Sequence, residues 1–126
     1  LCAGAQLKEV GGVIVEGPAR DIDEARELDF PVYARSATAT TARGRVYEQD
    51  FNCTIRVGDV EVKPGDYVIA DSSAVAFVPS DRAEEVLARA EQIADRERLM
   101  ILALNRGEAI TEVMGKNYET MLKELK

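Results

Sequence analysis

The sequence predicts an α/β fold, because a βαβ unit, an all-β segment and one long helix follow one another along the chain. Residues 13–15 form a short β-branched run, residues 22–28 have helical character, and residues 31–34 are a second apolar run. Strand, short helix and strand at this spacing are typical of a parallel pair. Residues 46–78 alternate between apolar runs and turns, and residues 80–105 have helical spacing. We therefore expect a mixed sheet and a long C-terminal helix.

The composition is that of an ordinary soluble protein, with 126 residues, 46% of them hydrophobic and 31% charged. This length is enough for one domain with a real core. The net charge of −7 argues against sequence-independent nucleic-acid binding, which needs a basic surface. No apolar run is long enough to span a membrane, and the first residues do not resemble a signal peptide. We expect a cytoplasmic protein whose partners are neither nucleic acid nor membrane.

Two amino-acid counts restrict the chemistry. The two cysteines, Cys2 and Cys53, form no CxxC motif, and two lone thiols fit a reducing cytoplasm better than a disulfide. The chain has no histidine, which excludes Ser-His-Asp and Cys-His sites and zinc sites with imidazole ligands. A metal would have to be held by carboxylates, carbonyls and water, and these ligands favour Mg²⁺, Mn²⁺ or Ca²⁺.

The chain begins inside a predicted helix, residues 1–8, which Gly11 and Gly12 end. A helix that begins without a cap suggests a natural polypeptide that starts before Leu1. Residues 35–45 are rich in Ser, Thr and Ala without an apolar period, and they predict a loop. Its basic and hydroxyl groups could face an anionic ligand, although a solvated loop is the default interpretation.

The middle of the chain predicts two hairpins. Residues 53–57 and 60–62 pair across a Gly-Asp turn, and Pro64-Gly65-Asp66 has the residues of a type II turn. The strands 67–71 and 74–78 are almost continuously apolar, which predicts that both of their faces are covered.

The long helix is predicted to begin with Ser80 as its cap and to end at Gly107. Residues 108–126 fit short amphipathic helices that dock on another surface. An apolar stripe along the long helix is interrupted at Glu97; its members are Val86, Ala90, Ile93, Met100 and Leu104. A carboxylate within such a stripe needs a partner, water or a metal. Spacing alone favours a half-exposed Glu97 at the edge of the stripe, paired with Arg96 or Arg98.

The adjacent pair Arg20-Asp21 follows the first strand and precedes a helix. Open α/β folds place ligands at such carboxyl ends of strands. Arginine offers a planar clamp for a carboxylate or phosphate, and aspartate is a hard oxygen ligand for Mg²⁺ or Mn²⁺. Asp21 followed by Glu24 also fits a helix N-cap with a capping box. Arg20 could equally be a surface ion-pair partner, and spacing alone leaves these interpretations open.

Several segments together resemble the RraA-like family, which includes metal-dependent 4-hydroxy-4-methyl-2-oxoglutarate and 4-carboxy-4-hydroxy-2-oxoadipate aldolases and the regulator of ribonuclease E activity A. The segments are VIVEGPARDIDE, DFPVYARSATATTARGRV, VGDVEVKPGDYVIAD and AVAFVPSDRAEEVLARAEQI, and the ending ITEVMGKNYETML is similar to the aldolase branch. The resemblance covers nearly the whole chain. It implies that residues 1–126 are a single RraA-like domain with a swivelling β/β/α fold that lacks its N-terminal portion.

The family pattern is an aspartate, twenty intervening residues and then Arg-Asp. Arg20 and Asp21 match the downstream pair, whereas the upstream aspartate would fall just before Leu1. Glu16 stands where the family usually has aspartate. By the resemblance, Arg20 binds the substrate carboxylate, Asp21 anchors Mg²⁺ or Mn²⁺, and a backbone amide at Leu1 helps to bind the pyruvate moiety.

The resemblance also implies trimers or hexamers in which a glutamate of the adjacent subunit's long helix holds metal-bound waters. Glu97 fits that position best, with Asp95 as the next candidate. The resulting hypothesis is a lyase, a divalent-metal pyruvate aldolase that cleaves 4-hydroxy-2-oxo acids and also decarboxylates oxaloacetate. The alternative is a non-catalytic regulator of the RraA type that binds a ribonuclease or helicase through its acidic surface.

Overall fold

The computed structural model describes residues 1–115. The chain forms two compact units, Leu1–Phe77 and Val78–Lys126. The expectation that residues 1–126 are one RraA-like domain stays a prediction.

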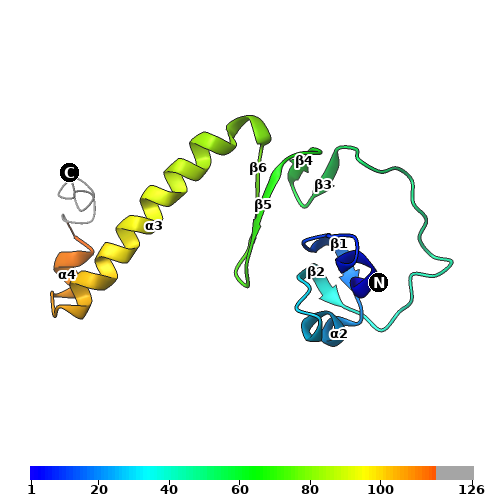
Figure 1. Cartoon of the computed structure of the whole chain (residues 1–126), viewed down its shortest axis with the longest axis horizontal. Helices are drawn as coiled ribbons and strands as arrows, with labels where there is room; N and C mark the ends of the chain where they lie inside the picture. The colour runs from blue at the N-terminus through cyan, green and yellow to red at the C-terminus, as the bar shows by residue number, and fades with distance from the viewer. Residues whose placement is uncertain (116–126) are drawn as a thin grey trace. The chain divides into compact units, whose positions relative to one another are not determined.

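The first unit contains the predicted βαβ arrangement. Strand β1 (Val13–Ala19) is followed by helix α2 (Ile22–Glu27) and strand β2 (Val32–Ala37). The two strands are parallel and lie side by side, with α2 in the connection between them (Figure 1). Ala25 of α2 is almost completely buried and Phe30, just after the helix, is 4% exposed. The burial of these two residues holds the short helix in place. The parallel pairing of β1 with β2 confirms the predicted parallel pair.

Strand β1 contains a β-bulge. Val15 lies opposite Ala34 and Pro18 lies opposite Ser36, so two residues of β1 face one residue of β2. The additional residue increases the local bend and twist of a strand and redirects the side chains beyond it. The bulge lies just before the Arg20-Asp21 pair, and no pattern in the sequence indicates it.

Both predicted hairpin turns are present in the first unit. Strands β3 (Ile55–Val57) and β4 (Val60–Val62) are antiparallel, and Gly58 in their turn has a φ of +58°. The second turn joins β4 to β5 (Tyr67–Ala70): the Asp66 amide donates to the Lys63 carbonyl at 3.1 Å. Gly65 has a φ of +92° in that turn, as position i+2 of a type II turn requires.

The predicted mixed sheet is wrong for the described residues. Three separate two-stranded sheets are present instead: β1 with β2, β3 with β4, and β5 with β6 (Val75–Val78). In each hairpin the two strands pair only with each other. Within the described residues, no backbone hydrogen-bond ladder joins the hairpins to the parallel pair. A side chain makes one connection, because the Tyr33 hydroxyl donates to the Ala70 carbonyl at 3.0 Å.

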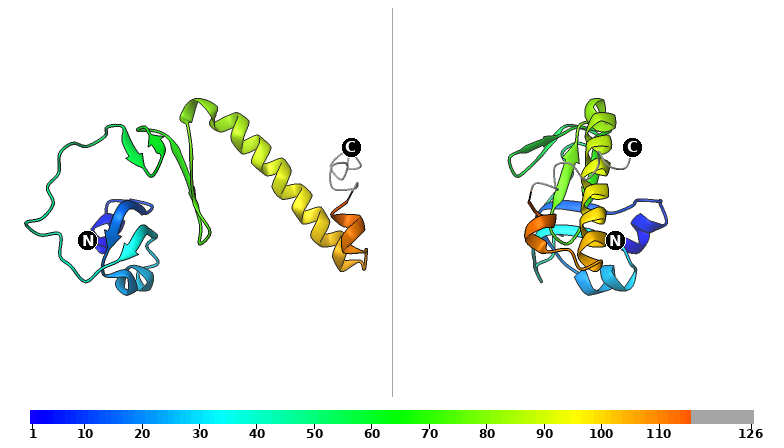
Figure 2. Two further views of the ribbon diagram at one scale, coloured as in Figure 1. Left: turned by 180° about the vertical axis from the view of Figure 1, so that it is seen from behind. Right: turned by 90° about the vertical axis from the view of Figure 1, so that its left-hand side faces the viewer.

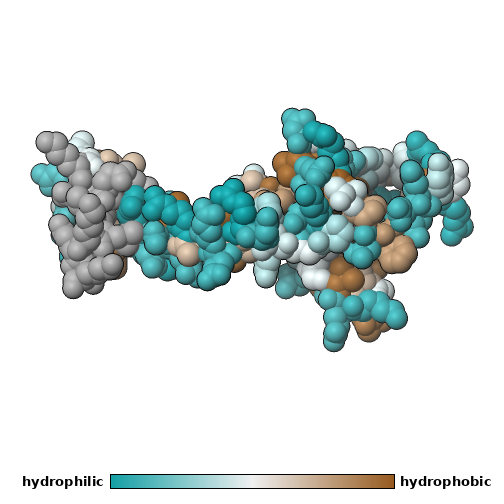
Figure 3. Space-filling model, turned by 90° about the horizontal axis from the view of Figure 1, so that it is seen from above, coloured by the Kyte–Doolittle hydropathy of each residue, from teal (hydrophilic) through white to brown (hydrophobic). Residues whose placement is uncertain are grey.

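The prediction that both faces of the apolar hairpin are covered is also wrong. On β5, Tyr67 is 52% exposed and Ile69 is 51% exposed. Val68, whose side chain points to the opposite face of β5, is 45% exposed. Hydrophobic surface is visible over the unit that contains the sheets, whereas the surface along α3 is mainly hydrophilic (Figure 3).

The second unit is dominated by one unbroken helix, α3 (Ala83–Asn105), preceded by a 3₁₀ turn, η1 (Ser80–Arg82) (Figure 2). Ser80 lies inside this turn and Arg82 occupies the N-cap position of α3, so the predicted Ser80 cap is wrong. A 3₁₀ turn often precedes an α-helix and supplies its first bonds.

Gly107 ends α3 with a φ of +90°, as predicted, because glycine adopts the left-handed conformation at little cost. The short helix α4 (Ile110–Val113) follows and contacts α3, and its Val113 is fully buried. The rest of the predicted C-terminal amphipathic segment, including Tyr118, Met121 and Leu122, lies outside the described residues.

At the opposite end of the chain, α1 (Cys2–Gln6) confirms the predicted terminal helix. Both cysteines are free thiols. No helix within residues 1–115 has the length and apolarity that crossing a membrane requires.

The turn between β3 and β4 provides a test of this backbone. A Cβ atom on Gly58 would lie 2.8 Å from Arg35 Nη2, in a left-handed conformation. We expect Gly58→Ala to lower the free energy of unfolding by about 1–2 kcal/mol, the cost of that conformation for an L-residue. In the control Gly4→Ala, within α1, the added Cβ meets nothing within 4 Å. This variant should stabilise by at most about 1 kcal/mol. Urea denaturation measures both, and equal effects would contradict the turn geometry.

Candidate functional site

Arg20 and Asp21 lie together at the carboxyl end of β1, where the chain turns into α2. They line a hollow of about 560 Å³. Asp23 and Glu24 at the start of α2 form an acidic wall of the hollow. The opposite side is formed by Ala37, the last residue of β2, and by the two residues that follow it. The carboxyl ends of two parallel strands thus meet at one edge, where α/β folds bind ligands. Thr38, in the segment predicted as a loop, is one of the lining residues.

The structure distinguishes between Asp21 as a helix cap and Asp21 as a residue of the hollow. Asp21 occupies the N-cap position of α2, but with φ 59° and ψ 38°, and its side chain makes no cap hydrogen bond. An N-cap residue normally has an extended backbone and uses its side-chain oxygen to bind a helix amide. The predicted capping box of Asp21 with Glu24 is therefore wrong. The left-handed backbone is one that aspartate tolerates better than most residues.

The Asp21 carboxylate is instead turned toward Arg20. Arg20 Nε donates to both carboxylate oxygens at 3.1 Å, and the two side chains are about half exposed. The Nη atoms of Arg20 make no hydrogen bond to any other residue within the described part of the chain. The guanidinium therefore presents its outer edge, which has the fork geometry that matches a carboxylate.

The fit of a divalent cation depends on the available oxygen atoms. Within residues 1–115, no group of three or more His, Cys, Asp or Glu side chains could hold a metal ion. The Asp21 carboxylate lies beside the Arg20 guanidinium, and the carboxylates of Asp23 and Glu24 also line the hollow. Mg²⁺ usually keeps several waters and takes one or two protein carboxylates together with its substrate. The donor set of this hollow fits such a water-rich site and does not fit an all-protein cage.

Leu1, the predicted pyruvate-binding residue, is completely exposed at the N-cap of α1. It is not among the residues that line the Arg20–Asp21 hollow. The structure therefore brings Arg20 and Asp21 together and does not bring Leu1 to them.

Glu97 and Asp95 lie on α3, in the second unit. Glu97 is exposed and makes no ion pair within residues 1–115, whereas the Asp95 carboxylate accepts a hydrogen bond from Arg98 Nη1. The interpretation of Glu97 as half exposed and paired with Arg96 or Arg98 is wrong, because Glu97 is exposed and makes no ion pair within residues 1–115, and Arg98 pairs with Asp95. The apolar stripe around Glu97 is itself partly exposed, with Ile93 40% exposed and Leu104 37% exposed. Of the two acidic candidates, Glu97 is the one whose carboxylate is available.

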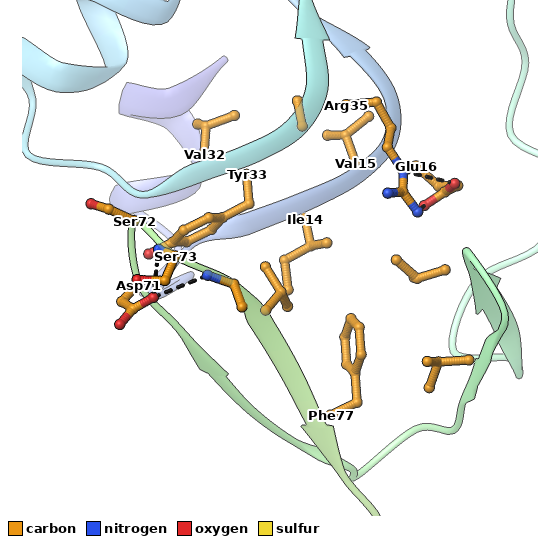
Figure 4. Close-up of a pocket in the computed structure, with 15 residues that line it drawn as sticks. Ile14, Val15, Glu16, Val32, Tyr33, Arg35, Asp71, Ser72, Ser73 and Phe77 are labelled. Carbon is orange, nitrogen blue, oxygen red and sulfur yellow. Dashed lines mark hydrogen bonds and ion pairs between the residues drawn. The ribbon is translucent and has the colours of Figure 1, made fainter.

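The structure brings together a second group of polar residues that the sequence did not predict. Arg35 on β2 donates from Nε to Glu16 Oε1 at 3.0 Å and from Nη2 to Glu16 Oε2 at 2.8 Å. The pair lies at one end of a cavity of about 520 Å³ whose apolar wall includes Ile14 and Phe77 (Figure 4). At the other end of this cavity, Asp71 Oδ1 accepts hydrogen bonds from the amides of Ser73 and Ala74.

The charges at the two ends of this cavity are stabilised by their surroundings. The hydrogen bonds from Arg35, with a contribution from the Gly58 backbone amide, lower the pKa of Glu16 below its ordinary value. Glu16 in turn raises the pKa of Arg35. The amides of Ser73 and Ala74 lower the pKa of Asp71. The only sequence signal for the first pair was that charged residues occupy otherwise apolar strands.

The comparisons with known proteins agree with this arrangement. The family model "RraA-like: Aldolase/RraA" matches residues 1–77, which is also the first compact unit. A crystal structure of an uncharacterised protein from Pseudomonas syringae pv. tomato superimposes with a TM-score of 0.85 at 26% identity. It covers 90% of this chain and 56% of the other.

Two curated relatives extend the comparison. A Halalkalibacterium halodurans protein named "Putative 4-hydroxy-4-methyl-2-oxoglutarate aldolase" is 30% identical over 88 residues, 70% of this chain and 41% of that protein. Protein DlpA of Legionella pneumophila is 28% identical over 108 residues, 86% of this chain and 18% of that protein. The chain thus spans about half or less of the length of these relatives.

A mixed α/β unit with a hollow at the carboxyl end of a parallel strand pair defines the general class of this protein. Within that class, the match over residues 1–77 shows that the chain belongs to the RraA-like (aldolase/RraA) family.

The Glu16–Arg35 pair makes a pH dependence testable. Because the pKa of Glu16 is lowered in the folded state, the pair stabilises the fold above the pKa that glutamate has in the unfolded chain. That contribution is lost as the pH falls through the lowered pKa. In Glu16→Gln we expect a weaker loss of stability on acidification than in the wild type. Thermal unfolding between pH 3 and 7, roughly the range over which carboxylates titrate, measures this, and parallel curves would contradict it.

Proposed function

We propose that this protein is a divalent-metal-dependent lyase that cleaves 4-hydroxy-2-oxo acids to pyruvate, with the Arg20–Asp21 hollow as its substrate site. The observation that carries the proposal is the conformation of Asp21. Its carboxylate is directed at Arg20 although its position at the start of α2 would normally use it as a helix cap. Membership of the aldolase/RraA family supports the same chemistry.

In this proposal, Arg20 binds and orients the substrate. The outer edge of its guanidinium pairs with the 2-oxo acid carboxylate, while Nε stays bonded to Asp21 and fixes the plane of the group. The 4-hydroxyl of the substrate then loses its proton, the bond between C3 and C4 breaks, and C3 takes up a proton to give pyruvate. The chain has no histidine, so proton transfer would use a carboxylate, a lysine, a tyrosine or water.

Asp21 would hold the divalent cation, Mg²⁺ or Mn²⁺, directly, and Glu97 of an adjacent copy would hold it through water. A bound cation supplies Lewis-acid stabilisation of the negative charge that develops on the carbonyl oxygen. The proposal includes a swivelling β/β/α architecture assembled as trimers or hexamers, in which one copy's α3 completes the site of another. Decarboxylation of oxaloacetate uses the same recognition of a 2-oxo carboxylate.

Metal-dependent pyruvate release tests this proposal. With 4-hydroxy-4-methyl-2-oxoglutarate or oxaloacetate and Mn²⁺, the wild type should release pyruvate, and EDTA should abolish the release. Arg20→Ala removes a charged hydrogen-bonding group and should lower kcat/KM by about 10- to 100-fold. Asp21→Asn removes the charge that the cation needs and should reduce the rate to background. A lactate dehydrogenase coupled assay measures both.

Matched controls come from the same helix. Glu27→Gln and Glu27→Ala remove an exposed charge of α2 that does not line the hollow, and they should retain wild-type kinetics. Loss of activity in the controls as well would indicate a folding defect. No pyruvate from the wild type with any metal would overturn the proposal and favour the non-catalytic regulator, whose test is binding to a ribonuclease or helicase.

The role of Glu97 is tested through the metal requirement of the reaction. Glu97→Gln should raise the Mn²⁺ concentration needed for half-maximal activity by about tenfold, as loss of an outer-sphere metal partner does, with an unchanged Tm because Glu97 is exposed. Asp95→Asn breaks the ion pair with Arg98 and should leave the Mn²⁺ requirement unchanged. The reverse order of the two effects would contradict the assignment.

A further inference from the structure

The bulge in β1 controls the direction of the side chains that come after it. Glu16 and Gly17 together lie opposite Arg35, and the next pairs are Pro18–Ser36 and Ala19–Ala37. Without the additional residue, Ala19 would face Thr38 instead. Since a shift of one residue moves each later side chain to the other face of the sheet, the bulge decides how the chain reaches the Arg20–Asp21 hollow.

The bulge and the Glu16–Arg35 ion pair occupy the same place. The two charged side chains belong to the residues that face each other across the bulge, and their two hydrogen bonds are parallel, at 3.0 and 2.8 Å. Such a bidentate pair fixes orientation as well as distance. Val15 and Ala34 form the last regular pair before the bulge, so Glu16 faces Arg35 directly after it. The ion pair therefore joins the two strands at the point where the bulge begins.

The β3–β4 turn supports the pair from the other side. Gly58 approaches Arg35 so closely that an added Cβ would lie 2.8 Å from Nη2. Its backbone amide and Asp59 add to the electrostatic environment of the pair. The guanidinium is therefore held between β1 and this turn.

The exposure of the pair limits what it can do. The side chains of Arg35 and Glu16 are 58% and 41% exposed, and exposed ion pairs contribute little to overall stability. A geometric role explains the arrangement better than a stabilising one, because bulges are common beside functional sites, where they redirect a side chain.

We propose that Glu16 and Arg35 are positioning residues, which clamp the bulge of β1 and thereby direct Arg20 and Asp21 into their hollow. The inference rests on the proposed function of that hollow. Neither residue touches the substrate; both act through the register of the last residues of β1.

Two backbone hydrogen bonds report on the clamp independently of activity. The Val13 amide donates to the Pro31 carbonyl before the bulge, and the Thr38 amide donates to the Ala19 carbonyl after it, both at 2.9 Å. Loss of the clamp should accelerate hydrogen exchange of the Thr38 amide by roughly tenfold through local opening and leave the Val13 amide unaffected. A residue with a merely stabilising role would change both amides alike.

The experiment is amide exchange by NMR together with pyruvate-release kinetics on the wild type, Glu16→Gln and Glu16→Asp. Glu16→Gln should accelerate exchange at Thr38 selectively and raise KM for the oxo acid, because Arg20 is misplaced. Glu16→Asp keeps the carboxylate and should restore both values toward the wild type. Glu61→Gln removes the exposed ion pair between Glu61 of β4 and the nearby Lys63. It is the matched control and should change neither value.

The outcomes separate the two proposals. Unchanged exchange at Thr38 in Glu16→Gln, or equal acceleration at Val13 and Thr38, would overturn the clamp even if the wild type releases pyruvate. Selective acceleration at Thr38 in a protein that releases no pyruvate would support the clamp and overturn the proposed reaction. Selective acceleration with an unchanged KM would overturn the link from the clamp to Arg20.

Discussion

The first unit depends on the parallel pairing of β1 with β2. This pairing requires the crossover through α2, which buries Ala25 and brings the carboxyl ends of both strands to the same edge. Arg20 and Asp21 leave β1 at that edge, and residues 37–39 leave β2 beside them. The candidate site is therefore a direct result of strand direction, because antiparallel pairing would place the ends of β1 and β2 at opposite edges.

The site combines weak individual interactions in a specific geometry. The Arg20–Asp21 and Glu16–Arg35 pairs are both partly exposed, so neither supplies much folding energy. Their contribution is to fix orientation. The Asp21 carboxylate fixes the guanidinium of Arg20, and the guanidinium of Arg35 joins β2 to β1 at the bulge. The left-handed backbone of Asp21 belongs to the same pattern, since it turns a carboxylate from a helix terminus toward an arginine.

The sequence predicted those features that depend on neighbouring residues. Gly58, Gly65 and Gly107 have positive φ where turns and a helix end were expected, and the βαβ order results from apolar runs at the right spacing. The bulge, the Glu16–Arg35 pair and the conformation of Asp21 depend on register across two strands, which a single chain pattern does not contain. The exposed β5 hairpin was predicted wrongly because continuous apolarity indicates a tendency to be covered, not the presence of a covering layer. The proposed role of Glu97 involves a second copy of the chain, and the pattern of one sequence does not encode such contacts.

The central claim is that the Arg20–Asp21 hollow binds a 2-oxo acid together with a divalent cation. Calorimetric titration of the protein with pyruvate, in the presence of Mn²⁺ and again with EDTA, tests it without requiring turnover. We predict binding with Mn²⁺, little or no binding with EDTA, and loss of the Mn²⁺-dependent binding in Asp21→Asn. Equal affinity with and without the metal, or an unchanged affinity in Asp21→Asn, would contradict the account.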